Sequence, residues 1–147
     1  MNLDSRLPGR TKTASSDEDV RTVVTVFIRR KKMILLLKRS DKVGMHKGMW
    51  CGVSGYVEAG EEPRDAATRE VSEETGLRVT KLRCGGSLDV RDGRVLWRVH
   101  PFLAEVEDGE PRLDIEHTEY LWINPGDILK YPRPPMLEDS LARALGV

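Results

Sequence analysis

Three glutamates near the middle of the chain, Glu70, Glu73 and Glu74, have the types and the spacing to do chemistry together. At i, i+3 and i+4 their carboxylates project from one face of a helix and lie within reach of one another. Like charges repel on this face. Glu73 and Glu74 also lie in the last turn before Gly76, where the negative end of the helix dipole disfavours anions. A hard divalent cation such as Mg²⁺ would relieve both costs, because it prefers carboxylate oxygens and leaves room for substrate phosphates. The charges alone favour a solvated acidic face, and a metal site needs support from the surrounding residues.

The segment before these glutamates supports the metal site. It is an acidic loop punctuated by glycines, which let the backbone approach a ligand closely, and it contains Ser54, Gly55, Glu58, Gly60 and Glu61. Pro63 suits the first turn of a helix and Gly76 suits its left-handed end, so we predict a helix from Pro63 to about Thr75. The loop and the carboxylate face are therefore contiguous.

The elements around this helix are mostly strands. Residues 21–28 and 33–40 are β-branched and aliphatic runs separated by basic residues, which predicts a hairpin. Further strands are expected near 49–53, on both sides of a turn at 92–93, and at 118–125. A final amphipathic helix places one apolar face toward the core, with Met136, Leu137, Leu141, Ala144 and Leu145. This order predicts an α+β fold, an α/β/α sandwich in which helices flank a mixed sheet.

Length and composition limit the organisation and the partners. The 147 residues, 39% of them hydrophobic, suit one domain, which we place at 21–147 after a polar, flexible segment at 1–20. Lys and Arg number 24 and so do Asp and Glu, so no global field favours nucleic acid or an anionic membrane. No apolar run is long enough to span a bilayer, no secretory signal is evident, and Cys51 and Cys84 lack metal spacing. We expect a cytoplasmic protein with two reduced thiols.

The stretch from Gly55 to Leu77 resembles the signature of a known family. The Nudix box reads GX5EX7REUXEEXGU, with U aliphatic, and the chain matches every specified position with Gly55, Glu61, Arg69, Glu70, Val71, Glu73, Glu74, Gly76 and Leu77. Residues 33–40 and 116–123 also resemble this family's flanking strands. The resemblance implies a MutT-like Nudix hydrolase that uses Mg²⁺ or Mn²⁺. Such enzymes cleave a phosphoanhydride in a nucleoside diphosphate linked to another moiety, by attack of water on phosphorus.

The resemblance also implies roles for individual residues. The metal ligands would be Glu70, Glu73 and Glu74 with the backbone carbonyl of Gly55, and Glu70 or Glu73 would orient or deprotonate the attacking water. Arg69 would hold Glu61 or Glu73 in place, or contact a phosphate. Family members often add an acidic residue from a loop beyond the box, which serves as an extra metal ligand or as a base. Glu116 is the first candidate for that role and Glu119 the second.

The substrate side is less specific. Lys38 and Arg39 end a predicted strand where related proteins carry a basic residue near the phosphates, with a solvated role as the alternative. Tyr56 is one of several aromatic residues that could stack on a base or belong to the core, with Trp50, Trp97, Tyr120, Trp122 and Tyr131. Many members have a proline and two glycines before the box, whereas residues 50–55 read WCGVSG. The base contacts of the nucleotide-sanitising enzymes therefore do not transfer.

We expect a small nucleotide-type diphosphate as the substrate, such as a nucleoside triphosphate, ADP-ribose or an NDP-sugar. Stable nucleic-acid and membrane partners are not expected, and the protein would be a monomer or a homodimer. Two alternatives stay open: a pyrophosphatase of a non-nucleotide diphosphate, and a non-catalytic Nudix-like ligand sensor.

Overall fold

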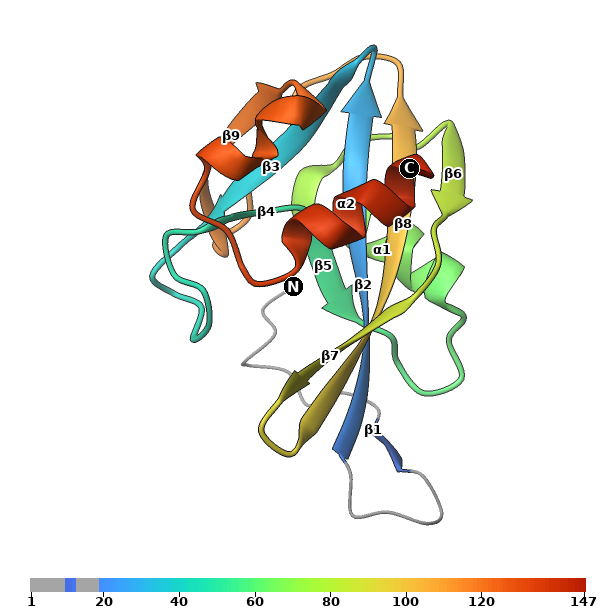
Figure 1. Ribbon diagram of the computed structural model, residues 1–147. Coiled ribbons are helices and arrows are strands. Elements are labelled where there is room, and N and C mark those ends of the chain that lie inside the picture. The colour runs from blue at the N-terminus through green and yellow to red at the C-terminus, as the bar shows by residue number, and fades with distance from the viewer. Residues whose placement is uncertain (1–9, 13–18) are drawn as a thin grey trace.

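The computed structural model describes residues 10–12 and 19–147 and shows one mixed sheet between two helices. Figure 1 shows α2 across the front of the sheet and α1 behind it, which confirms the α+β sandwich. In chain order the elements are β1 (Arg10–Lys12), β2 (Asp19–Arg30), β3 (Met33–Arg39), β4 (Trp50–Cys51), β5 (Val53–Tyr56), α1 (Pro63–Thr75), β6 (Lys81–Cys84), β7 (Leu88–Asp92), β8 (Val95–Val106), β9 (His117–Ile123), the 3-10 helix η1 (Pro125–Lys130) and α2 (Leu137–Leu145).

Strand β2 is the centre of the sheet. It runs parallel to β8 along its full length and forms the predicted hairpin with β3 only at the tip, where Arg29 pairs with Ile34. Beyond the tip β2 pairs with β5 instead, while β3 pairs with β4 and β9. The chain crosses from β4 to β5 at Gly52, where an added Cβ would lie 2.8 Å from a carbonyl oxygen of β2. The crossing therefore requires glycine.

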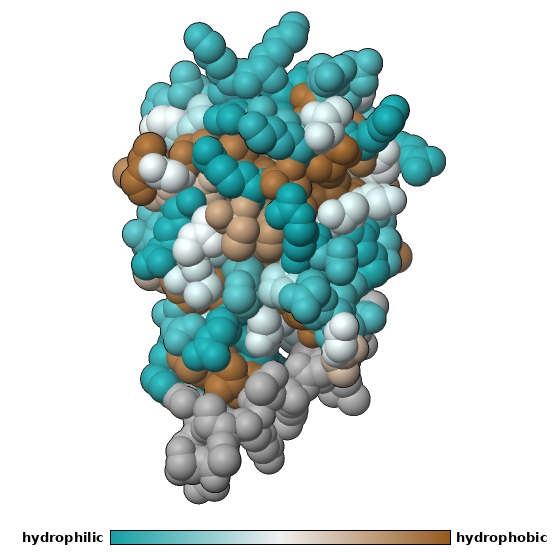
Figure 2. Space-filling view, turned by 90° about the vertical axis from the view of Figure 1, so that its right-hand side faces the viewer, coloured by the Kyte–Doolittle hydropathy of each residue, from teal (hydrophilic) through white to brown (hydrophobic). Residues whose placement is uncertain are grey.

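The core has one layer on each face of the sheet. Alternate residues of β2 point to opposite faces: Val24, Val26 and Ile28 pack toward α1, and Phe27 packs toward α2. Helix α1 contributes fully buried small residues, including Ala66 and Ala67, so it lies close against the sheet. Burial on both faces explains why β2 and β3 are continuous apolar runs rather than alternating ones. Seen from the side of β6, apolar side chains gather in the upper half of the surface, and a smaller apolar patch lies near its lower edge (Figure 2).

Several sequence expectations can be compared with these elements. The predicted helix from Pro63 to Thr75 is confirmed, and Gly76 ends it with a left-handed φ of 70°. Met136 was expected on the apolar face of the last helix, but it precedes α2 in a left-handed conformation and is 39% exposed. No helix among the described residues is long and apolar enough to cross a bilayer.

The ordered part of the chain begins earlier than predicted. Strand β2 starts at Asp19 rather than at Arg21, because its first residues pair with both β1 and β8. Within the segment predicted to be flexible, residues 10–12 form β1 along the start of β2. The rest of that segment lies outside the described residues.

Candidate active site

The acidic face of α1 is divided by burial. Glu70 and Glu74, one turn apart, are 0% and 1% exposed, whereas the side chain of Glu73 is 48% exposed. The sequence places all three carboxylates on one helical face, but only the first and the last turn into the protein. Glu73 lies at the solvent margin, 3.5 Å from a guanidinium nitrogen of Arg69.

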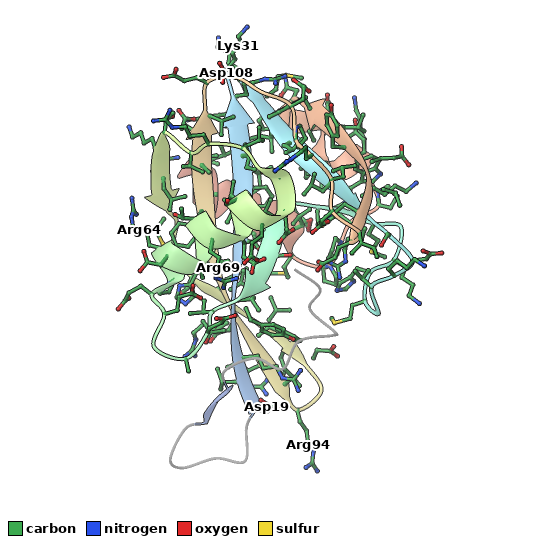
Figure 3. The ribbon with its side chains drawn as sticks, turned by 180° about the vertical axis from the view of Figure 1, so that it is seen from behind. Asp19, Lys31, Arg64, Arg69, Arg94 and Asp108 are labelled. Carbon is green, nitrogen blue, oxygen red and sulfur yellow. The ribbon has the colours of Figure 1, made fainter. Side chains whose placement is uncertain are left out.

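Arg69 ties the loop before α1 to the buried carboxylates. Its guanidinium donates two hydrogen bonds of 2.9 Å to the carboxylate of Glu61, one of 3.2 Å to the carbonyl of Tyr56, and one of 2.5 Å to Glu70. Glu61 in turn accepts a bond from the backbone N–H of Glu58. Figure 3 shows Arg69 on the side of α1 that faces β5, while Arg64 points outward from the other side. The predicted pairing of Arg69 with the box carboxylates is what the contacts show.

The buried carboxylates form an environment that favours a cation. Burial, together with the adjacent Glu70 side chain, raises the pKa of Glu74 well above its usual value. Hydrogen bonding to Glu61 and the charge of Glu70 raise the pKa of Arg69, which therefore stays charged. The single guanidinium of Arg69 contacts three carboxylates, those of Glu61, Glu70 and Glu73, and cannot offset all their charge. The donor chemistry of this site therefore fits a hard divalent cation. As the side chains stand, no three His, Cys, Asp or Glu residues in the described ranges are arranged to hold a metal. Glu73 faces Arg69 instead.

The loop between β8 and β9 brings a further carboxylate to the site. Glu116 is 8% exposed, and burial raises the pKa of its side chain. Its backbone carbonyl accepts a 2.7 Å bond from the N–H of Ser40, and its own N–H donates to Asp114 at 3.1 Å. A shift in the register of β3 and β9 lies directly beside it, between Lys38 and Arg39. Such irregularities re-aim side chains at the end of a strand.

A cavity of about 350 Å³ lies beside Arg39 and Cys51, and its lining contains none of the four glutamates of the candidate site. Its lining includes Arg39, Cys51 and Ser54 on the sheet, Trp97 on β8 and Ser140 on α2. Burial raises the pKa of the Cys51 thiol to about 12, and the charges of Glu74 and Glu116 add to the rise while Arg39 opposes it. Cys51 therefore lines the cavity and also lies close enough to Glu74, Glu116 and Arg39 for their charges to act on it. A cavity of this size is in the range that accommodates small ligands.

Arg39 is the buried basic residue that lines this cavity. It is 3% exposed, and its Nε donates to the carbonyl of Met45 at 2.9 Å. Its Nη2 is buried and has no hydrogen-bond partner among the described residues. Lys38, predicted with it, instead pairs with Glu119 at 3.2 Å and does not line the cavity.

Three further expectations need correction or refinement. Tyr56 was a candidate for stacking on a base, but its ring is 1% exposed and stacks on Trp97 within the core. Gly55 was placed in a loop, whereas it lies buried in β5 and pairs with Val24. Glu119 belongs to β9, is largely exposed and pairs with Lys38, so Glu116 is the loop carboxylate at the site.

Sequence reasoning missed Asp114 and His117, which flank Glu116. The imidazole of His117 has one nitrogen 2.9 Å from a carboxylate oxygen of Asp114 and the other 3.7 Å from Glu74. The only signal in the sequence was the position of these residues next to a candidate acidic ligand. Contact with Glu74 depends on the fold, because more than 40 residues separate the two in sequence.

The solved structures that resemble this chain define its class. A MutT protein from Methanosarcina mazei Go1 is 25% identical and superimposes with a TM-score of 0.75 over 90% of this chain and 97% of its own. A family model described as the NUDIX domain matches residues 19–143. The chain belongs to this family and is MutT-like.

Curated relatives carry different names. A nucleoside triphosphatase NudI from Escherichia coli is 31% identical over 122 residues, which cover 76% of this chain and 86% of that protein. An NAD-capped RNA hydrolase NudC from Mannheimia succiniciproducens is 35% identical over 131 residues, 83% of this chain but 45% of its own length. Another relative is covered over only 26% of its length. The family is thus shared by proteins of different size and different named activity.

Proposed function

We propose that this protein is a Mg²⁺- or Mn²⁺-dependent Nudix hydrolase that cleaves a phosphoanhydride in a nucleoside diphosphate linked to another moiety. The observation that carries the proposal is the pair of buried carboxylates, Glu70 and Glu74. Arg69 clamps Glu70, His117 lies 3.7 Å from Glu74, and Arg39 and Cys51 beside them line a cavity of about 350 Å³. Burying these charges against one another is costly unless a cation compensates them.

The residues of the chain divide the work. Glu70, Glu73 and Glu74, with the carbonyl of Gly55, would hold the metal, which neutralises phosphate charge when bound. Glu116 or Glu73 would accept the proton of the attacking water. Burial raises the pKa of Glu116, which makes it a stronger base than an exposed glutamate. Arg69 keeps Glu70 and Glu61 in place through its fork of hydrogen bonds.

The cavity would receive the part of the substrate beyond the cleaved bond. Arg39 lies between the cavity and the carboxylates, and its buried Nη2 is available to an anionic oxygen. The apolar lining and Trp97 suit a flat ring such as a nucleobase. A nucleoside with a phosphate chain fits this order of groups better than an inorganic polyphosphate, which needs no apolar wall.

The experiment is product analysis by mass after incubation with Mg²⁺ in ¹⁸O water. The panel contains nucleoside triphosphates and their oxidised forms, ADP-ribose, NDP-sugars, NADH and dinucleoside polyphosphates. We expect cleavage of one class, with ¹⁸O in the phosphate that water attacked. Glu70→Gln should abolish turnover, and Glu105→Gln, a matched change on β8 at a surface pair with Arg29, should not.

Absence of cleavage across this panel would contradict the proposal. If the protein still binds Mg²⁺, non-nucleotide diphosphates would be tested next. If it binds a nucleotide without cleaving it, the ligand-sensor alternative would replace the hydrolase.

A further inference from the structure

We propose that His117 is a positioning residue that holds the loop carboxylate Glu116 and the helix carboxylate Glu74 in one fixed arrangement. This inference rests on the proposed function and extends it to residues that the Nudix box does not contain. The observation is that the two nitrogens of one buried imidazole face carboxylates from two different elements.

The first contact lies within the loop. The carboxylate oxygen Oδ1 of Asp114 lies 2.9 Å from Nδ1 of His117 and also accepts the backbone N–H of Glu116 at 3.1 Å. An ionised carboxylate only accepts hydrogen bonds, so Nδ1 is the donor. Burial alone would raise the pKa of Asp114, but the bond from His117 outweighs it and lowers that pKa. The Asp114–His117 contact therefore fixes the turn from which Glu116 projects.

The second contact joins the loop to α1. Nε2 of His117 lies 3.7 Å from Oε1 of Glu74, a close contact that is too long for a hydrogen bond. Both side chains are 1% exposed, so water does not screen the contact. Because Nδ1 is held by Asp114, the ring cannot rotate away from Glu74 without losing a buried hydrogen bond.

The backbone on either side prevents the loop from following such a rotation. Ser40 donates its N–H to the carbonyl of Glu116 and its hydroxyl to the carbonyl of Ile115 at 2.9 Å. His117 itself pairs with Arg39 in the ladder of β3 and β9. The imidazole is thus a rigid spacer between a fixed strand end and Glu74. Groups that orient a metal ligand from behind commonly change metal affinity or activity by about 10- to 100-fold when removed.

The test separates the two contacts with three variants. His117→Asn places an amide nitrogen near the position of Nδ1 and keeps the contact with Asp114. His117→Gln places one near the position of Nε2 and keeps the contact with Glu74, while His117→Leu keeps neither. Mn²⁺ alone is titrated into each protein by calorimetry at one pH. We expect His117→Leu to weaken Mn²⁺ binding about tenfold or more, and each amide variant to recover part of the loss.

Asp114→Asn is then added to each amide variant. It should weaken Mn²⁺ binding in the His117→Asn background, where the contact with Asp114 survives, and change it little in the His117→Gln background. This pair of double variants carries the test if His117→Leu does not fold. In turnover assays the single variants should lower kcat with little change in KM, because the cavity that binds the nucleoside is untouched.

Three results would overturn the proposal: wild-type affinity and kcat in His117→Leu, equal losses in all three single variants, or no Mn²⁺ binding by the wild-type protein. The first two leave the hydrolase proposal standing. Conversely, a wild-type protein that binds Mn²⁺ and shows the expected order of affinities, but cleaves nothing, refutes the proposed activity and supports the positioning role.

Discussion

Replacing Glu74 by glutamine should change how the stability of the metal-free protein depends on pH. Glu74 is 1% exposed, and burial beside Glu70 raises its pKa well above the ordinary value of 4.5. In the unfolded chain the same carboxyl group returns to that ordinary value. Between the two pKa values the folded protein therefore binds more protons than the unfolded chain, and folding is progressively opposed as the pH rises.

The size of the effect follows from proton linkage. One group in this state lowers the free energy of unfolding by up to about 1.4 kcal/mol for each pH unit, until the pH passes its raised pKa. Glu116, whose pKa burial also raises, acts in the same direction. Burial and Arg98 lower the pKa of His100, which acts in the opposite direction below its ordinary value of 6.5. The slope is therefore measured above pH 6.5.

Urea unfolding in EDTA at several pH values from about 6.5 to 8.5 measures this slope. We expect the stability of the wild-type protein to fall with pH and that of Glu74→Gln to fall less, with equal or greater stability at the alkaline end. Glu73→Gln is the matched control, because it makes the same substitution one position away at a side chain that is 48% exposed. Saturating Mg²⁺ should stabilise the wild-type protein by about 2.7 kcal/mol at a hundred times its Kd, and Glu74→Gln by less. Parallel slopes in wild type and Glu74→Gln would refute the reasoning.

Three further predictions concern other parts of the structure. Arg69→Lys loses the two-pronged contact with Glu61, so urea titration should show a loss of about 1–3 kcal/mol, and an unchanged midpoint would contradict the clamp. Near pH 8 a thiol reagent should modify exposed Cys84 and spare Cys51, whose pKa burial raises to about 12; two fast-reacting thiols would disprove this. Gly52→Ala should cost about 1–3 kcal/mol by thermal unfolding, because its Cβ would lie 2.8 Å from a backbone oxygen, whereas a neutral change would show that the crossing can relax.

The architecture could be predicted because its signals are local. Pro63 and Gly76 delimit α1 by the backbone angles that they favour, and the apolar runs of β2 and β3 indicate strands buried on both faces. The path of the sheet was not predictable in the same way. Ser54 and Gly55 of β5 favour a loop by their residue types, and nothing in them says that this segment replaces β3 beside β2 after the hairpin tip.

The candidate site shows the same division. Glu70, Glu73 and Glu74 share a helical face by their spacing alone, but spacing cannot say that the sheet covers the first and third and leaves the second in solvent. That difference depends on how closely α1 packs, which small residues such as Ala66 and Ala67 permit. Similarly, the aromatic ring of Tyr56 could stack on a nucleobase or belong to the core. Its burial and its stacking on Trp97 show that it belongs to the core.

The box accounts for only one side of the site. Its residues lie on α1 and on the segments directly before and after it, and Arg69 connects Glu61 with Glu70. The other side comes from the ends of β3 and β9, where Arg39, Glu116 and His117 arrive through strand pairing and one register shift. A box that is intact in sequence therefore does not by itself assemble the site. His117 contacts Asp114 on one side of the site and Glu74 on the other. Substitution of His117 should therefore weaken metal binding in a protein that still folds.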